Sequence, residues 1–180
     1  KEWLVKAPGV VFAIAAAIRA FTKPGDGVMI QQPVYYPFRN TILANERECV
    51  NSPLVLEDGR YRMDLDDMER KIREHDVKLF ILCSPHNPVG RVWTKDELAA
   101  AGRLCEKYDV IVVSDEIHSD FTYGGLTHTV FPSISPQLAE RTILCTAPSK
   151  TFNLAGLQVS NIFVPDQKLR RAMRRAIDQT

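Results

Sequence analysis

Three residues of this chain combine a polar side chain that could bind a ligand or react with a position shortly after an apolar run. Lys150 is the first of them: it follows Ile143-Leu-Cys-Thr-Ala147 and lies in the stretch APSKTFNLAG, residues 147–156. A lysine held in an apolar cleft can have a lowered pKa, and a neutral amine is a nucleophile toward carbonyl groups. The alternative is a surface lysine, the commonest role of this residue type. Lys150 is therefore a candidate nucleophile.

Asp115 is the second, and it closes the run that begins Val110-Ile-Val-Val113. Its carboxylate is expected at the mouth of a sheet, where an ionised acid needs a partner, and a cationic cofactor nitrogen is one such partner. An ordinary helix N-cap or turn aspartate is the alternative.

Asn87 is the third, in the segment Ser84-Pro-His-Asn-Pro-Val-Gly90 after another apolar run. Asn, Pro and Gly all favour turns, so this segment alone could be no more than a tight turn. Ser149, beside Lys150, could likewise be no more than a turn residue.

The elements that must position these residues alternate between helices and buried strands. The apolar patterns predict helices over Val10–Phe21, over Asp64–His75, after the capping box Thr94-Lys-Asp-Glu97 and after Pro165. They predict strands at Val28–Ile30, Val77–Cys83, Val110–Val113, Thr142–Ala147 and Val159–Val164.

This alternation predicts an α/β fold with a mainly parallel sheet and helices on both faces, because strands covered on both sides read as solid apolar runs. In open α/β sheets, ligands bind outside the carboxyl ends of the strands. The clusters around Asn87, Asp115 and Lys150 are therefore expected to face one cleft.

Composition excludes several classes of function. The formal net charge is +1, which gives no general attraction to nucleic acid or to an anionic membrane, and no apolar run has the length that crosses a bilayer. The first residues do not read as a secretory signal. The cysteines Cys49, Cys83, Cys105 and Cys145 lie far apart. They indicate reduced residues of a cytoplasmic protein rather than a disulfide or metal framework.

No metal site is expected. Glu116, His118 and Asp120 carry possible ligand atoms, but the sequence has no H-E-x-x-H helix and no second cluster at ligand spacing. The basic run after Pro165 is interpreted as a solvated or domain-facing helix side rather than a nucleic-acid patch.

Taken in chain order, Asn-Pro-x-Gly, then Asp-Glu-x-His, then Ser-Lys followed by Ala-Gly resemble the motifs of fold-type-I enzymes that use pyridoxal 5'-phosphate (PLP). The resemblance extends from about Pro8 to Val164. Residues 84–93 and 147–156 look most like the bacterial cystathionine β-lyase group, the carbon–sulfur lyases of the class I/II aminotransferase superfamily.

The resemblance implies a role for each motif residue. Lys150 would bind PLP covalently and later move a proton at the substrate α-carbon. Asp115 would pair with the pyridinium nitrogen and so support the electron-withdrawing ring. Asn87 would donate a hydrogen bond to the phenolic oxygen, and His118 would lie beside that oxygen, where many relatives have tyrosine. The Asn87-Pro88 peptide bond is expected to be cis, and Gln32-Pro33 is a weaker candidate.

The remaining cofactor contacts follow from the same resemblance. Tyr35, in Gln32-Pro-Val-Tyr-Tyr-Pro37, would stack on the pyridine ring, with a tyrosine-rich loop that packs on the core as the alternative. Backbone N–H groups of Val10 and Val11 would bind the phosphate at a helix N-terminus, and Ser149 would add a hydroxyl.

The resemblance also sets expectations for the whole protein. Residues 1–180 would form the PLP-binding large domain of a longer chain, without its amino-terminal segment and its carboxyl-terminal small domain. A carbon–sulfur β-lyase acting on cystathionine or cysteine-like amino acids, as a homodimer, is the first expectation. An aminotransferase and a non-catalytic PLP-fold regulator are the alternatives. Gln158, where many aminotransferases have an arginine that pairs with the phosphate, favours the lyase.

Overall fold

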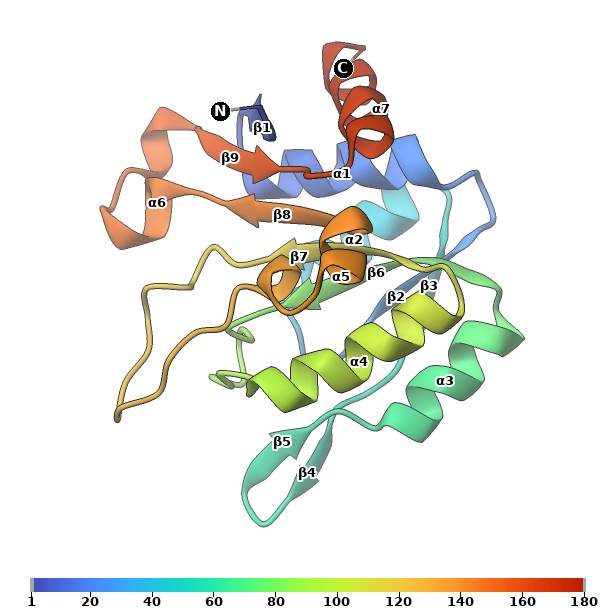
Figure 1. Ribbon diagram of the computed structural model, residues 1–180, viewed down its shortest axis with the longest axis vertical. Helices are drawn as coiled ribbons and strands as arrows, with labels where there is room; N and C mark the ends of the chain where they lie inside the picture. Colours follow the sequence, from blue (N-terminus) through green and yellow to red (C-terminus); the bar gives the residue numbers. More distant parts are fainter. Residues whose placement is uncertain (1, 180) are drawn as a thin grey trace.

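The computed structural model describes residues 2–179, which form a seven-stranded sheet with helices on both faces and a separate two-stranded hairpin (Figure 1). The strand order in the large sheet is β1-β9-β8-β7-β6-β2-β3. Strands β3, β2, β6, β7 and β8 pair in parallel, whereas β8 with β9 and β9 with β1 pair antiparallel. The predicted α/β fold with a mainly parallel sheet is confirmed.

The elements have the following bounds: β1 Leu4–Ala7, α1 Val10–Phe21, β2 Gly27–Ile30, α2 Pro37–Ala44, β3 Glu48–Asn51, β4 Val55–Glu57, β5 Arg60–Arg62, α3 Leu65–Glu74, β6 Val77–Cys83, α4 Lys95–Lys107, β7 Ile111–Asp115, η1 Phe131–Ser133, α5 Pro136–Glu140, β8 Thr142–Thr146, α6 Pro148–Thr151, η2 Ala155–Leu157, β9 Ser160–Phe163 and α7 Gln167–Asp178.

An apolar core lies on each face of the sheet, because successive strand residues point to opposite faces. In β6, Leu79 and Ile81 pack in the core shared with α1, α2 and α7, whereas Phe80 and Leu82 pack in the core shared with α3, α4 and α5. Figure 1 shows the two groups of helices on opposite sides of the sheet. Burial on both faces explains why these strands are solid apolar runs in the sequence.

Side-chain caps fix the beginnings of two predicted helices. Thr94 Oγ1 accepts a hydrogen bond from Glu97 N at 3.2 Å, and Glu97 Oε2 accepts one from Thr94 N at 2.8 Å, so the predicted capping box is confirmed. Asp64 Oδ1 accepts from Asp67 N at 2.9 Å and acts as the N-cap of α3.

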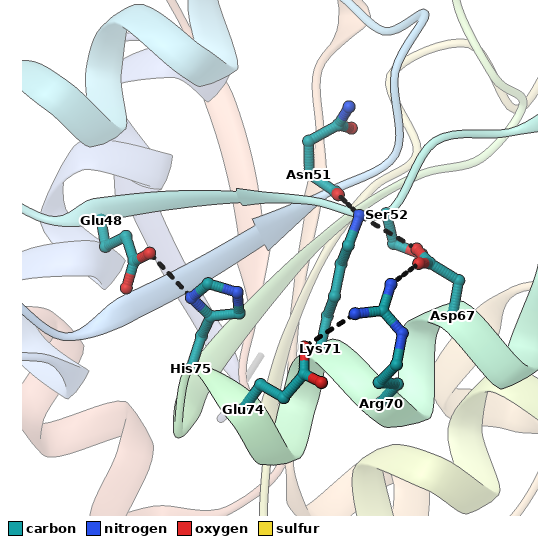
Figure 2. Close-up of polar contacts among 8 residues, drawn as sticks. All are labelled: Glu48, Asn51, Ser52, Asp67, Arg70, Lys71, Glu74 and His75. Carbon is teal, nitrogen blue, oxygen red and sulfur yellow. Dashed lines mark hydrogen bonds and ion pairs between the residues drawn. The ribbon is translucent and has the colours of Figure 1, made fainter.

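Polar contacts fasten α3 to the end of β3 (Figure 2). Asp67 accepts a hydrogen bond from Ser52 Oγ at 2.8 Å and lies 3.1 Å from Lys71 Nζ. Lys71 also donates to the backbone carbonyl of Asn51, and Arg70 pairs with Asp67. These contacts set the position of α3 along the edge of the sheet.

Part of the basic run on α7 is used within the fold. Arg170 is buried and donates to the backbone carbonyls of Val164 and Pro165, both at 2.8 Å. Arg174 lies on the exposed side and reaches the carbonyl of Leu4 at 3.4 Å. Among residues 2–179, no helix has the length and apolar character that crossing a membrane requires.

Candidate active site

The fold brings all of the predicted site residues together in one pocket of about 350 Å³. The pocket opens at the carboxyl ends of β6, β7 and β8, where a parallel sheet places its ligands. Its lining includes Val10, Val11, Tyr35, Asn87, Asp115, His118, Ser149 and Lys150. The sequence-based expectation of a single cleft is therefore met by the geometry.

Asp115 is the last residue of β7 and is only 6% exposed. Its Oδ1 accepts one hydrogen bond, from Ile117 N at 3.2 Å. Burial raises the pKa of Asp115 to about 7; the charge of Glu116 acts in the same direction, while the Ile117 N–H and the charge of Lys150 oppose it. A buried carboxylate whose negative charge is stabilised by so few neighbouring groups is suited to bind a cationic nitrogen.

Lys150 lies on α6, a single helical turn that follows β8. Its side chain is exposed, which differs from the enclosed apolar setting expected from the sequence. The reason is that α6 extends beyond the end of the sheet, so the described residues do not cover it. Thr151 Oγ1 donates to Asp120 Oδ2 at 2.6 Å and ties α6 to the loop that carries His118.

Asn87 and His118 form two further parts of the pocket wall. The backbone N–H of Asn87 donates to Cys83 Sγ at 3.4 Å. The peptide bonds Asn87-Pro88 and Gln32-Pro33 are cis, as predicted, and Ser84-Pro85, which was not predicted, is cis as well. His118 is partly buried, and burial followed by the charge of Lys150 lowers its pKa.

The N-terminus of α1 provides the part of the lining best suited to an anion. Gly9, the N-cap, has a φ of 156°, a conformation that L side chains rarely adopt, and no side chain caps this end of the helix. The first-turn N–H groups of Val10 and Val11 have no partner within the helix, and the helix dipole favours negative charge there.

Tyr35 lines the pocket, whereas its neighbour Tyr36 is 72% exposed and lies outside the lining. The Tyr35 ring packs edge-on against Phe38, with ring centroids 5.8 Å apart. Ser149 lies in the lining. Gln158 is exposed, at the end of η2, and is not part of the lining.

Sequence reasoning missed Cys83, Ile117, Pro8 and Phe12 as parts of the lining. Cys83 was interpreted as a core thiol. It is buried in the core, and as the last residue of β6 it also lines the pocket. Like Asp115, Cys83 ends an apolar run, and this position could have indicated that it lines the pocket.

Glu116 is a buried acid with a structural set of partners. Its carboxylate accepts hydrogen bonds from Ser114 Oγ at 2.8 Å and Phe131 N at 2.9 Å, and it lies 2.6 Å from His128 Nε2. Within residues 2–179, no group of three His, Cys, Asp or Glu side chains is arranged to hold a metal ion.

Comparisons with known proteins place this geometry in a family. The model of aminotransferase class I and II matches residues 2–180. The chain is 49% identical to cystathionine beta-lyase PatB of Bacillus subtilis, over 95% of this chain and 44% of that protein. It is 28% identical to the asparagine–oxo-acid transaminase of Streptococcus mutans, over 100% of this chain and 45% of that protein.

Among solved structures, cystalysin from Treponema denticola, which contains a PLP cofactor, matches with a TM-score of 0.97 and 46% identity. The match covers 99% of this chain and 45% of the cystalysin chain. The chain thus spans less than half the length of these relatives. On the family match and the 49% identity, it belongs to the aminotransferase class I and II family.

Proposed function

We propose that the full-length protein is a PLP-dependent carbon–sulfur β-lyase that converts cystathionine or a cysteine-like amino acid to a thiol, pyruvate and ammonia. The observation that carries the proposal is the meeting of Lys150, Asp115 and Asn87 in one pocket at the ends of three neighbouring parallel strands. Similarity to cystathionine beta-lyase PatB supports this choice of reaction. Residues 1–180 would be the PLP-binding large domain.

The residues present fit the chemical groups of PLP. The buried Asp115, with its pKa raised to about 7, lacks a strong cationic partner, and a protonated ring nitrogen would supply one. The open N-terminus of α1 suits a phosphate, and Tyr35 offers an aromatic face. Lys150 supplies an amine within the same lining.

When bound, PLP withdraws electrons from the α-carbon of an amino acid joined to it. Lys150 would hold the cofactor through its side-chain amine and would act as the base that removes the α-proton of the substrate. Asp115 would keep the ring nitrogen protonated, because an ionised carboxylate in a buried setting stabilises a nearby cation.

The remaining residues bind and orient. Asn87 would donate a hydrogen bond from its side-chain amide to the phenolic oxygen, with His118 beside it, and Tyr35 would offer its ring to the cofactor ring. The backbone N–H groups of Val10 and Val11 and the hydroxyl of Ser149 would bind the phosphate. No arginine lines the pocket among the described residues, so this phosphate site depends on hydrogen bonds and on the helix dipole.

An aminotransferase is the second candidate, because the matching family model and the Streptococcus mutans relative are of that kind. It would use the same residues and differ only after the α-proton is removed. A non-catalytic PLP-fold regulator is disfavoured, because the nucleophile, the acid and the amide all lie in the pocket.

A homodimer and a cytoplasmic location are part of the proposal. Phe152 and Leu157, two and seven residues after Lys150, are 66% and 67% exposed, and exposed large apolar side chains are typical of surfaces that another subunit covers. All four cysteines are free, as expected of a protein in a reducing compartment.

The test is to give the full-length enzyme L-cystathionine or L-cysteine without any keto acid. Continuous release of pyruvate and ammonia is expected from the lyase. A single turnover that leaves pyridoxamine phosphate and restarts when a keto acid is added would instead identify a transaminase.

A further inference from the structure

A buried histidine joins two loops that line the proposed cofactor pocket. His86 lies in the loop after β6, is 2% exposed, and has its Nε2 2.9 Å from the backbone carbonyl oxygen of Pro33, in the loop after β2. A carbonyl oxygen only accepts, so Nε2 carries the proton and donates it. Tyr35 lies two residues after Pro33, and Asn87 directly follows His86. One hydrogen bond therefore connects the loop that carries Tyr35 to the loop that carries Asn87.

The histidine is itself held in place from the side of α4. Its ring meets that of Trp93 edge-on, with centroids 5.5 Å apart at 88°, and Trp93 Nε1 donates to the carbonyl of Cys83 at 3.0 Å. The Arg91 guanidinium lies 4.5 Å from the centre of the Trp93 ring and pairs with Glu97, the glutamate of the α4 capping box. Edge-on packing against this anchored Trp93 ring, together with the bond from Nε2 to Pro33, thus fixes the position of the imidazole.

His86 is suited to hold a position rather than to exchange protons. Burial lowers its pKa to about 4, against the opposing effect of nearby backbone carbonyls, so the ring stays neutral near pH 7. It is not among the residues that line the 350 Å³ pocket. Any effect on the cofactor must act through the loops on either side.

We infer that His86 is a positioning residue that keeps Tyr35 and Asn87 at the spacing a bound PLP ring requires. The inference rests on the proposed function for the identity of the ligand. The link between the two loops is a property of the protein alone and can be measured without PLP.

The test compares His86→Leu, His86→Asn and His86→Gln in the full-length protein. A glutamine amide nitrogen reaches about the position of Nε2, whereas an asparagine nitrogen reaches about that of Nδ1. Loss of one buried hydrogen bond corresponds to about a five- to tenfold change in an equilibrium constant. We expect His86→Leu and His86→Asn to weaken PLP binding by about that factor and His86→Gln to restore most of it.

The second readout is amide hydrogen exchange in the PLP-free protein. Exchange should rise at residues 34–38 and 87–91 in His86→Leu and His86→Asn, stay unchanged in β7 and β8, and return toward wild type in His86→Gln. His75→Leu, which removes a surface histidine paired with Glu48 (Figure 2), is the matched control and should change neither readout. If His86→Leu does not fold, the asparagine and glutamine variants still make the comparison.

Three results would overturn the inference: unchanged exchange and PLP affinity in His86→Leu and His86→Asn, a glutamine variant no better than asparagine, or faster exchange throughout the sheet. The last would assign His86 to global stability. A wild-type protein that fails to bind PLP would refute the proposed function, while the exchange data would still report on the link between the loops.

Discussion

The buried environment of Asp115 determines which ligand groups the pocket can bind. Asp115 is 6% exposed, and its carboxyl group accepts a single hydrogen bond and has its pKa raised to about 7. Ionising it without a partner is unfavourable, whereas ionising it beside a cation is favourable. A cationic ring nitrogen as its partner therefore explains why this position has an aspartate and why the aspartate is buried.

Replacing this carboxylate should affect both cofactor binding and chemistry. We expect Asp115→Ala to weaken PLP binding and to slow removal of the substrate α-proton, because an unprotonated pyridine is a poorer electron acceptor. PLP titration and exchange of the α-proton with solvent deuterium measure the two effects.

Asp120→Ala is the control, since Asp120 is an exposed acid of the next loop whose carboxylate bonds to Thr151. The Asp115 effect should be clearly larger. Small, equal effects from the two substitutions would assign Asp115 to turn structure.

At the residue scale, the pocket lining could be predicted in large part because Asp115 and Asn87 follow apolar runs and carry recognisable motifs. The exposure of Lys150 could not, because it depends on what packs over α6. His86 and Glu116 were also missed as organising residues. His86 bonds to Pro33, 53 residues away, and Glu116 bonds to His128 and Phe131 in a later loop, 12 and 15 residues away, so no local pattern connects them.

At the scale of elements, the strands and helices that were predicted agree with the structure to within about two residues, because burial on both faces leaves a strong apolar signal. The predicted strand Thr142–Ala147 ends one residue earlier, at Thr146. The antiparallel direction of β9 was not predicted, and neither were the shorter elements β1, α2, β3, β4, β5 and α5. Strand direction is set by connections and pairing, and the four residues of β1, one of which is Lys6, form too short a pattern.

Asp67 is the residue that ties α3 to β3, and its contribution should depend on pH. Burial raises its pKa, but hydrogen bonds from Ser52, Lys71 and Arg70 outweigh burial and leave the pKa below its ordinary value of 3.8. A lowered pKa in the folded state adds stability above the ordinary value, and this contribution is lost as the pH falls through the folded-state pKa.

We expect Asp67→Asn to lower the free energy of unfolding by about 1 kcal/mol near neutral pH, and by less near pH 3. Denaturant unfolding of the PLP-free full-length protein at both pH values is the measurement. Glu74→Gln, which removes the exposed partner of Arg70 on the same helix, is the control and should have a smaller effect. A loss that stays constant with pH would contradict the electrostatic account.

At the scale of the whole molecule, the sheet order explains how distant segments form one site. Strands β6, β7 and β8 are neighbours in the sheet, so the residues that follow them meet at one edge, and the N-terminus of α1 completes the pocket. Parallel pairing was predictable from the alternation of helices and strands. The contribution of α1 came from the family resemblance, because no local signal in the sequence places its N-terminus beside those strand ends.

The central claim is that this pocket holds PLP through Lys150. The most direct measurement is to treat the PLP-loaded full-length protein with borohydride, which reduces the link between PLP and an amine to a stable bond, and to map the modified peptide by mass spectrometry. The account predicts that the adduct lies on Lys150 and disappears in Lys150→Ala. An adduct on another lysine, or one that persists in Lys150→Ala, would contradict it.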